Sequence, residues 1–60
     1  MTDQAEQARM EKVISSLVRS GANPNEAREM TEQYYHEVRR ITKLTAPAKL
    51  AKYVMIAASI

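Results

Sequence analysis

The chain has 60 residues and a mass of 6.8 kDa, which limits it to one small domain spanning residues 1–60. It is 45% hydrophobic with one glycine and two prolines, which excludes a chain disordered by composition, a flexible linker and a turn-rich β architecture. The formal net charge of +2 falls short of the dense basic footprint of most nucleic-acid-binding domains.

No cysteine is present, so neither a disulfide nor a cysteine-based zinc site stabilises the domain. Small domains without such a cross-link commonly gain stability by self-association. The longest uncharged apolar run, Tyr53 to Ile60, is far shorter than the roughly 20 residues that cross a bilayer. The N-terminus shows no basic segment leading into an apolar stretch. We therefore expect a cytoplasmic homo-oligomer that does not enter a membrane.

The first predicted helix begins at Thr2 or Asp3, because Asp3 and Glu6 have the spacing of a capping box. Apolar residues then recur at the spacing of one helical face: Met10, Val13, Ile14, Leu17 and Val18. Polar residues fall on the opposite face: Arg9, Lys12, Ser16 and Arg19. Gly21 is placed to end this helix as a left-handed C-cap.

The second predicted helix has the strongest start signal, with Asn23 as N-cap, Pro24 at the first helical position and Glu26 closing a capping box. Acidic residues near its start and basic residues near its end complement the helix dipole. Pro47 is expected to end the helix, because a proline disfavours the α conformation in the residue before it. The expected buried stripe consists of Ala27, Met30, Tyr34, Val38 and Ile41.

A third helix is predicted from Pro47 to the C-terminus, with Thr45 or Ala46 as its cap. One face carries Leu50, Tyr53, Val54 and Ala57, and a stripe of smaller residues lies beside it: Ala48, Ala51, Met55 and Ala58. The connecting loops are short, so the first two helices should pack roughly antiparallel with the third folded across them. The predicted fold class is all-α: a helical hairpin plus a C-terminal helix, completed by homodimerisation.

No catalytic residue, metal ligand or cofactor site is expected. The chain has one His and one Asp, and a single glycine cannot build a phosphate-binding loop. Glu32 and His36 share a helix face, but two ligands are fewer than the three or four that zinc normally takes. The simpler interpretation is a solvent-facing pair of side chains. We therefore expect a protein that is not an enzyme.

Charge is distributed unevenly along the chain. Residues 1–35 carry four cations and six acids, a net charge of −2, whereas residues 36–60 carry five cations and one acid, a net charge of +4. The five cations flank the bend at Pro47: Arg39, Arg40, Lys43, Lys49 and Lys52. They predict either a basic patch that contacts nucleic-acid phosphates or a solvated surface that complements the helix dipole. Nucleic acid is the less favoured partner, because few aromatic residues are interleaved and acids occupy the first turn of the second helix.

Tyr35 falls outside the predicted buried stripe and aligns with Arg28, Glu32 and Arg39 on the polar face. One interpretation is an exposed tyrosine stacked on Arg39 in a cation–π contact. The other is a surface for a protein partner built from Arg28, Tyr35 and Arg39, since Tyr and Arg are enriched at binding hot spots.

The C-terminal half of the third helix has no charge after Lys52, and Ile56 and Ile60 continue the face on which Lys49 and Lys52 lie. A helix that is apolar on all sides is normally buried on all sides. A frayed terminus is one interpretation, and a subunit or partner interface is the other. The predicted oligomer interface consists of Met10, Val13, Leu17, Met55, Ile56 and Ile60.

These features together predict a small regulatory protein without enzymatic activity. The leading hypothesis is a helical module that dimerises and acts as an adaptor or inhibitor by binding a partner protein. The alternative is a small nucleic-acid-binding regulator that uses the basic patch around the bend between the second and third helices.

Overall fold

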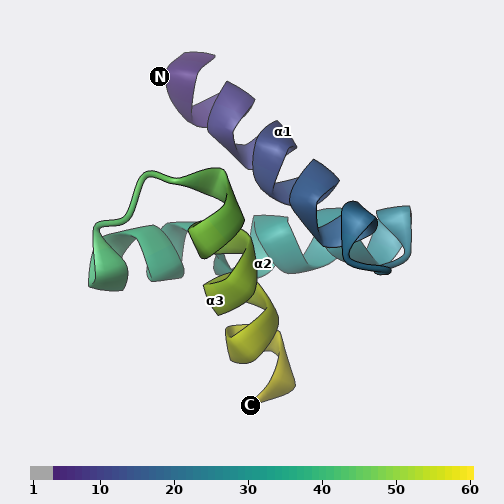
Figure 1. Ribbon diagram of the computed structural model, residues 1–60. Coiled ribbons are helices and arrows are strands. Elements are labelled where there is room, and N and C mark those ends of the chain that lie inside the picture. Colours follow the sequence, from purple (N-terminus) through teal and green to yellow (C-terminus); the bar gives the residue numbers. More distant parts are fainter. Residues whose placement is uncertain (1–3) are drawn as a thin grey trace.

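The computed structural model describes residues 4–60, which form three helices: α1 (Gln4–Arg19), α2 (Pro24–Thr42) and α3 (Pro47–Ser59) (Figure 1). No strand occurs within residues 4–60. The predicted all-α, three-helix class is therefore confirmed.

The turn between α1 and α2 follows the local signals in the sequence. Gly21 has a φ of 109°, and the amide of Ala22 donates to the Leu17 carbonyl at 3.0 Å, which closes α1 with a Schellman motif. Asn23 caps α2, because its side-chain oxygen accepts a 2.9 Å hydrogen bond from the amide of Asn25. Both predicted caps are confirmed, whereas the capping box expected at Asp3 lies outside the described residues.

The end of α2 differs from the prediction, because the helix stops at Thr42 and not next to Pro47. Lys43 takes a left-handed conformation with a φ of 58°, and its amide donates to the Arg39 carbonyl at 2.8 Å. The Thr42 hydroxyl accepts a 3.2 Å hydrogen bond from the amide of Leu44. With the helix ended at this point, Leu44 packs against the core.

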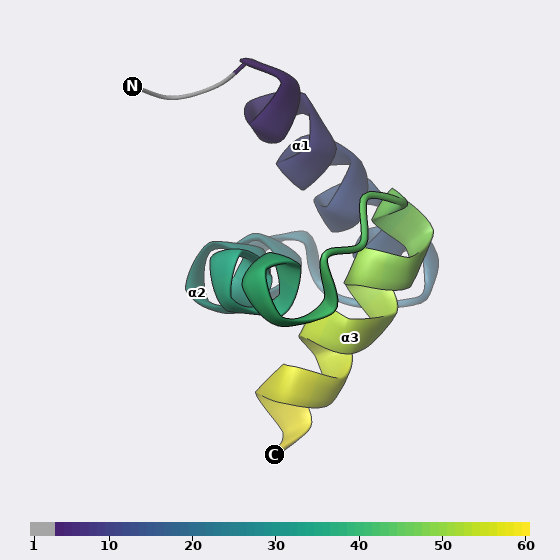
Figure 2. The same cartoon turned by 90° about the vertical axis from the view of Figure 1, so that its left-hand side faces the viewer.

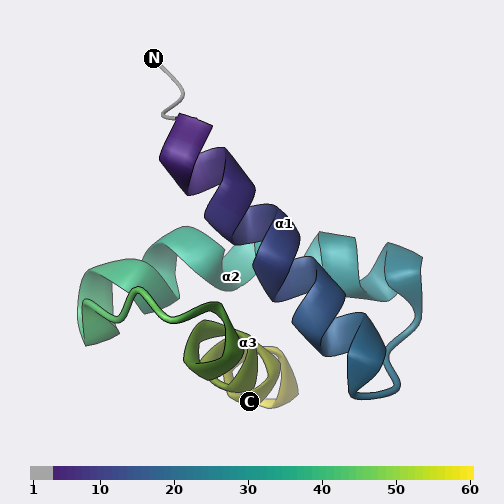
Figure 3. The same ribbon diagram turned by 45° about the horizontal axis from the view of Figure 1, so that its top comes forward.

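Each helix packs against the other two. α2 returns in the general direction opposite to α1, but the two axes cross obliquely and do not lie alongside one another (Figures 1 and 3). α3 lies across both helices, and its C-terminal end points away from them (Figures 1 and 2).

The core lies where the three helices meet and draws on all of them. Its buried members are Val13, Ile14 and Leu17 from α1, Ala27, Thr31, Tyr35 and Val38 from α2, and Leu50, Ala51 and Val54 from α3. Met10, Met30, Tyr34, Leu44 and Ala57 are partly buried around this set.

The predicted buried face of α2 is confirmed at Ala27 and Val38, but it is wrong at Ile41 and at Tyr35. Tyr35, expected on the polar face, is 0% exposed and is the largest fully buried side chain, whereas Ile41 is 70% exposed. Tyr34 is only partly buried. Thr31 and Tyr35 are both 0% exposed, so the inward face of α2 passes through these two residues, and Met30 and Tyr34 lie partly buried at its edge.

Candidate interaction site

The predicted oligomer interface separates into two groups in the structure. Val13 and Leu17 are fully buried inside the chain, and Met10 is partly buried against the same core. Val13 and Leu17 therefore offer no surface to a second subunit, whereas Met10 keeps part of its side chain exposed. The α1 part of the predicted interface is corrected accordingly.

The α3 part of the predicted interface is exposed. Met55 is 38% exposed, Ile56 is 45% exposed and Ile60 is 98% exposed. Together with Lys52 and Ser59 they line one open depression at the C-terminal end of the helix. We call Met55, Ile56 and Ile60 the α3 apolar patch. The inward face of α3 is already occupied by core contacts, so this patch has no covering element within residues 4–60.

The predicted partner surface of Arg28, Tyr35 and Arg39 does not exist as a surface. Tyr35 lies in the core, with its ring edge-on to the His36 ring at 5.4 Å between centroids. Arg28 is exposed and pairs with Glu11 of α1 at 3.5 Å. The prediction of a common contact surface is wrong because α2 turns Tyr35 inward.

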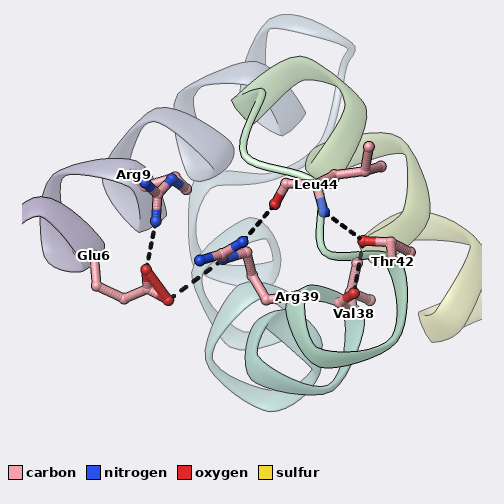
Figure 4. A network of polar contacts seen from close by, with 6 residues as sticks. All are labelled: Glu6, Arg9, Val38, Arg39, Thr42 and Leu44. Atoms are coloured by element: carbon pink, nitrogen blue, oxygen red, sulfur yellow. Dashed lines mark hydrogen bonds and ion pairs between the residues drawn. The ribbon is translucent and has the colours of Figure 1, made fainter.

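Arg39, expected to contact a partner or a phosphate, has a structural role. Its Nη1 donates a 2.8 Å hydrogen bond to the Leu44 carbonyl, and its Nε lies 3.6 Å from Glu6 Oε1 (Figure 4). Arg9 contacts the other oxygen of the same carboxylate. This network connects the first turns of α1 to the end of α2 and to the loop that follows it. The Arg39 side chain is only 27% exposed, so the guanidinium is committed to the fold.

The remaining members of the predicted basic patch differ in their pairing. Arg40 pairs with Glu37 one turn earlier on α2. Lys43, Lys49 and Lys52 are exposed and form no ion pair with any residue in 4–60. Three of the five predicted cations therefore have no acidic partner within residues 4–60.

A groove that the sequence did not predict runs along the seam between α1 and α3. One end is lined by Lys12, Ser15, Ser16, Arg19, Pro47 and Ala48. It adjoins a second depression that shares Ser16 and Ala48 and adds Leu17, Ser20, Ala51, Lys52 and Met55. We call these two depressions the α1–α3 groove. The sequence showed the polar face of the first helix and the small-residue stripe of the third helix, but only the packing of α1 against α3 brings these two faces together into a groove.

Residues 4–60 contain no group of three or more His, Asp or Glu side chains able to hold a metal ion. Likewise, none of the helices in this range combines the length and the apolar character needed to cross a membrane. No protein family matches the sequence, and neither a curated protein nor a solved structure is similar to the chain.

Proposed function

We propose that this protein is a non-enzymatic helical interaction module of the cytoplasm, which forms a homodimer through the α3 apolar patch and binds a partner protein as an adaptor or inhibitor. The supporting observation is the exposure of Met55, Ile56 and Ile60 on a helix whose other face is already used by the core. Contiguous exposed apolar residues of this kind mark interaction surfaces.

The small size of the chain favours a second copy of it as the molecule that covers the α3 apolar patch. A domain of 60 residues buries a small fraction of its own surface and gains stability when another copy covers its apolar residues. Each large aliphatic side chain moved from water into an interface contributes about 1.5–3 kcal/mol. A twofold axis through the patch would use every such contact twice, which helps to offset the entropy lost on association.

The action on a partner would be steric. A dimer of compact three-helix domains presents two copies of every remaining surface, so it can cover a functional surface of a partner or hold two partners together.

Sedimentation velocity of the wild type and of Ile56→Lys at matched concentrations tests the dimer. The wild type should sediment as a dimer and Ile56→Lys as a monomer, because an unpaired charge in an apolar interface is strongly unfavourable. The matched control is Ile41→Lys, which makes the same change at an exposed position on α2 outside the α3 apolar patch. A monomeric wild type, or an Ile56→Lys variant that remains dimeric, would contradict the proposed interface.

A second candidate function is that of a nucleic-acid-binding regulator, supported by the exposed and unpaired Lys43, Lys49 and Lys52. With Arg39 and Arg40 engaged within the fold, this set is weaker than the sequence suggested. A gel shift with nonspecific duplex DNA, titrated with salt, tests it: binding should weaken steeply as salt rises. Absence of a shift at low salt removes this function.

A further inference from the structure

The α1–α3 groove has a cationic rim. Lys12 and Arg19 come from α1, and Lys52 comes from α3. None of the three forms an ion pair with a residue in 4–60. No Asp or Glu lines either depression of the groove. The rim is therefore a set of like charges that the fold leaves unneutralised.

The nearby acids do not compensate this charge. On α1, Glu6 is held by Arg9 and Arg39, and Glu11 pairs with Arg28 of α2. On α3, residues 47–59 contain no acidic residue at all. Carboxylates on another molecule would therefore complement the charge of the rim.

Between these cations the groove is lined by small side chains. Ser16 of α1 and Ser20 of the turn after it line the groove together with Ala48 and Ala51 of α3, and Met55 at one end also belongs to the α3 apolar patch. Small residues on both sides leave room for the side chains of another segment, and Pro47 and Ala48 provide apolar contacts. Cations at the rim and apolar atoms inside complement an amphipathic segment that carries acidic residues.

From this arrangement we infer that the α1–α3 groove binds an acidic amphipathic segment of the partner protein, with carboxylates on Lys12, Arg19 and Lys52 and apolar side chains against Pro47 and Ala48. This inference rests on the proposed function and specifies which surface of the module holds the partner. The first turn of α3 adds to it, because Ala46 caps that helix without a side-chain hydrogen bond and the positive end of its dipole lies at Pro47 and Ala48.

The mixed character of the groove favours a peptide over other anionic partners. Nucleic-acid phosphates would use the cations but not the apolar contacts, and the groove contains no aromatic side chain on which bases could stack. A bilayer surface is broad, whereas the small residues lie in a recess between two helices. A second copy of this chain would need to bring its own acidic residues into the groove, which a salt-dependent oligomer would reveal.

The test selects binders from a phage-displayed library of random peptides, each about 16 residues long. The immobilised full-length protein and two of its charge variants serve as targets. Arg19→Glu/Lys52→Glu reverses two rim charges. Lys43→Glu/Lys49→Glu is the matched control, because it makes the same change in net charge at two exposed lysines that do not line the groove. Circular dichroism establishes that each variant is folded, and Arg19→Gln/Lys52→Gln replaces the reversal if it is not.

The wild type and the control should enrich peptides with acidic residues at helical spacing around apolar ones. Fluorescence anisotropy with the most enriched peptide should show affinity at least about tenfold weaker for Arg19→Glu/Lys52→Glu. Enrichment of neutral or basic peptides, no enrichment, or equal binding by the rim variant would overturn the inference.

Two further measurements test whether another molecule binds in the α1–α3 groove. Duplex DNA and phosphatidylserine vesicles are tested alongside the peptide, and binding to either one in its place would assign the groove to a phosphate-bearing ligand and overturn the inference. Assembly beyond a dimer that the rim variant abolishes would assign the groove to a second copy, with the same consequence. Sedimentation of the same samples reports the α3 interface separately, so a dimer that binds no acidic peptide refutes this inference and leaves the proposed dimer intact.

Discussion

The guanidinium of Arg39 donates a 2.8 Å hydrogen bond to the backbone carbonyl of Leu44, five residues further along the chain (Figure 4). The same side chain reaches Glu6 near the start of α1. Arg39 therefore fixes the point at which the chain leaves α2, and with it the direction in which α3 begins. Arg39, which the sequence predicted as a phosphate contact, instead stabilises the fold.

Arg39→Ala should lower the free energy of unfolding by about 1–3 kcal/mol, because it leaves the partly buried Leu44 carbonyl without its donor and removes a partner of Glu6. Urea denaturation followed by circular dichroism measures the change. Arg40→Ala is the matched control, since Arg40 is 75% exposed and its pair with Glu37 joins two residues of the same helix. The control should change stability by less than about 0.5 kcal/mol. Equal losses in the two variants would refute the role assigned to Arg39.

The adjacent tyrosines of α2 provide a test of its rotation. Tyr35→Ala should cost about 3–5 kcal/mol, because it empties the space of the largest buried side chain. A domain of this size has only about 3–9 kcal/mol in total, so the variant should be largely unfolded. Tyr34→Ala removes a partly buried ring and should leave a folded protein. Thermal melts of the two variants measure the difference, and the reverse order would show that α2 presents its other face to the core.

Removing the N-cap of α2 should lower stability by less than removing Tyr35. Asn23→Ala should lower stability by about 1 kcal/mol, because the amide of Asn25 loses its acceptor. Asn25→Ala is the control, since it removes an exposed side chain and keeps the backbone amide that makes the bond. An unchanged melting temperature for Asn23→Ala would show that the side chain does not cap the helix in solution.

The features that the sequence predicted correctly are the ones encoded locally. Gly21 and Asn23 each act on backbone groups within five residues, so their effects can be recognised without knowing the fold. The spacing of apolar residues likewise placed all three helices. The rotation of α2 was missed because Tyr34 and Tyr35 are chemically identical neighbours, and only the packing of α1 and α3 decides which of them is buried.

The candidate sites were harder to predict because they depend on contacts between helices. Val13 and Leu17 form an apolar stripe whether it faces a second subunit or the same chain, and the structure shows that α2 and α3 already cover it. The sequence alone does not distinguish Arg39 from a surface cation, because its contact with Leu44 is known only from the structure. The α1–α3 groove exists only after α1 and α3 come together, so neither helix alone indicates it.

The central claim is that the α3 apolar patch is the contact between two copies of the chain. An isotope-filtered NOE spectrum of an equimolar mixture of carbon-13-labelled and unlabelled protein tests it without any substitution, because it reports only contacts between different chains. The account predicts intermolecular NOEs from the side-chain methyl groups of Met55, Ile56 and Ile60. Intermolecular NOEs confined to residues of α1 or α2, or none in a sample that sedimentation shows to be monomeric, would contradict it.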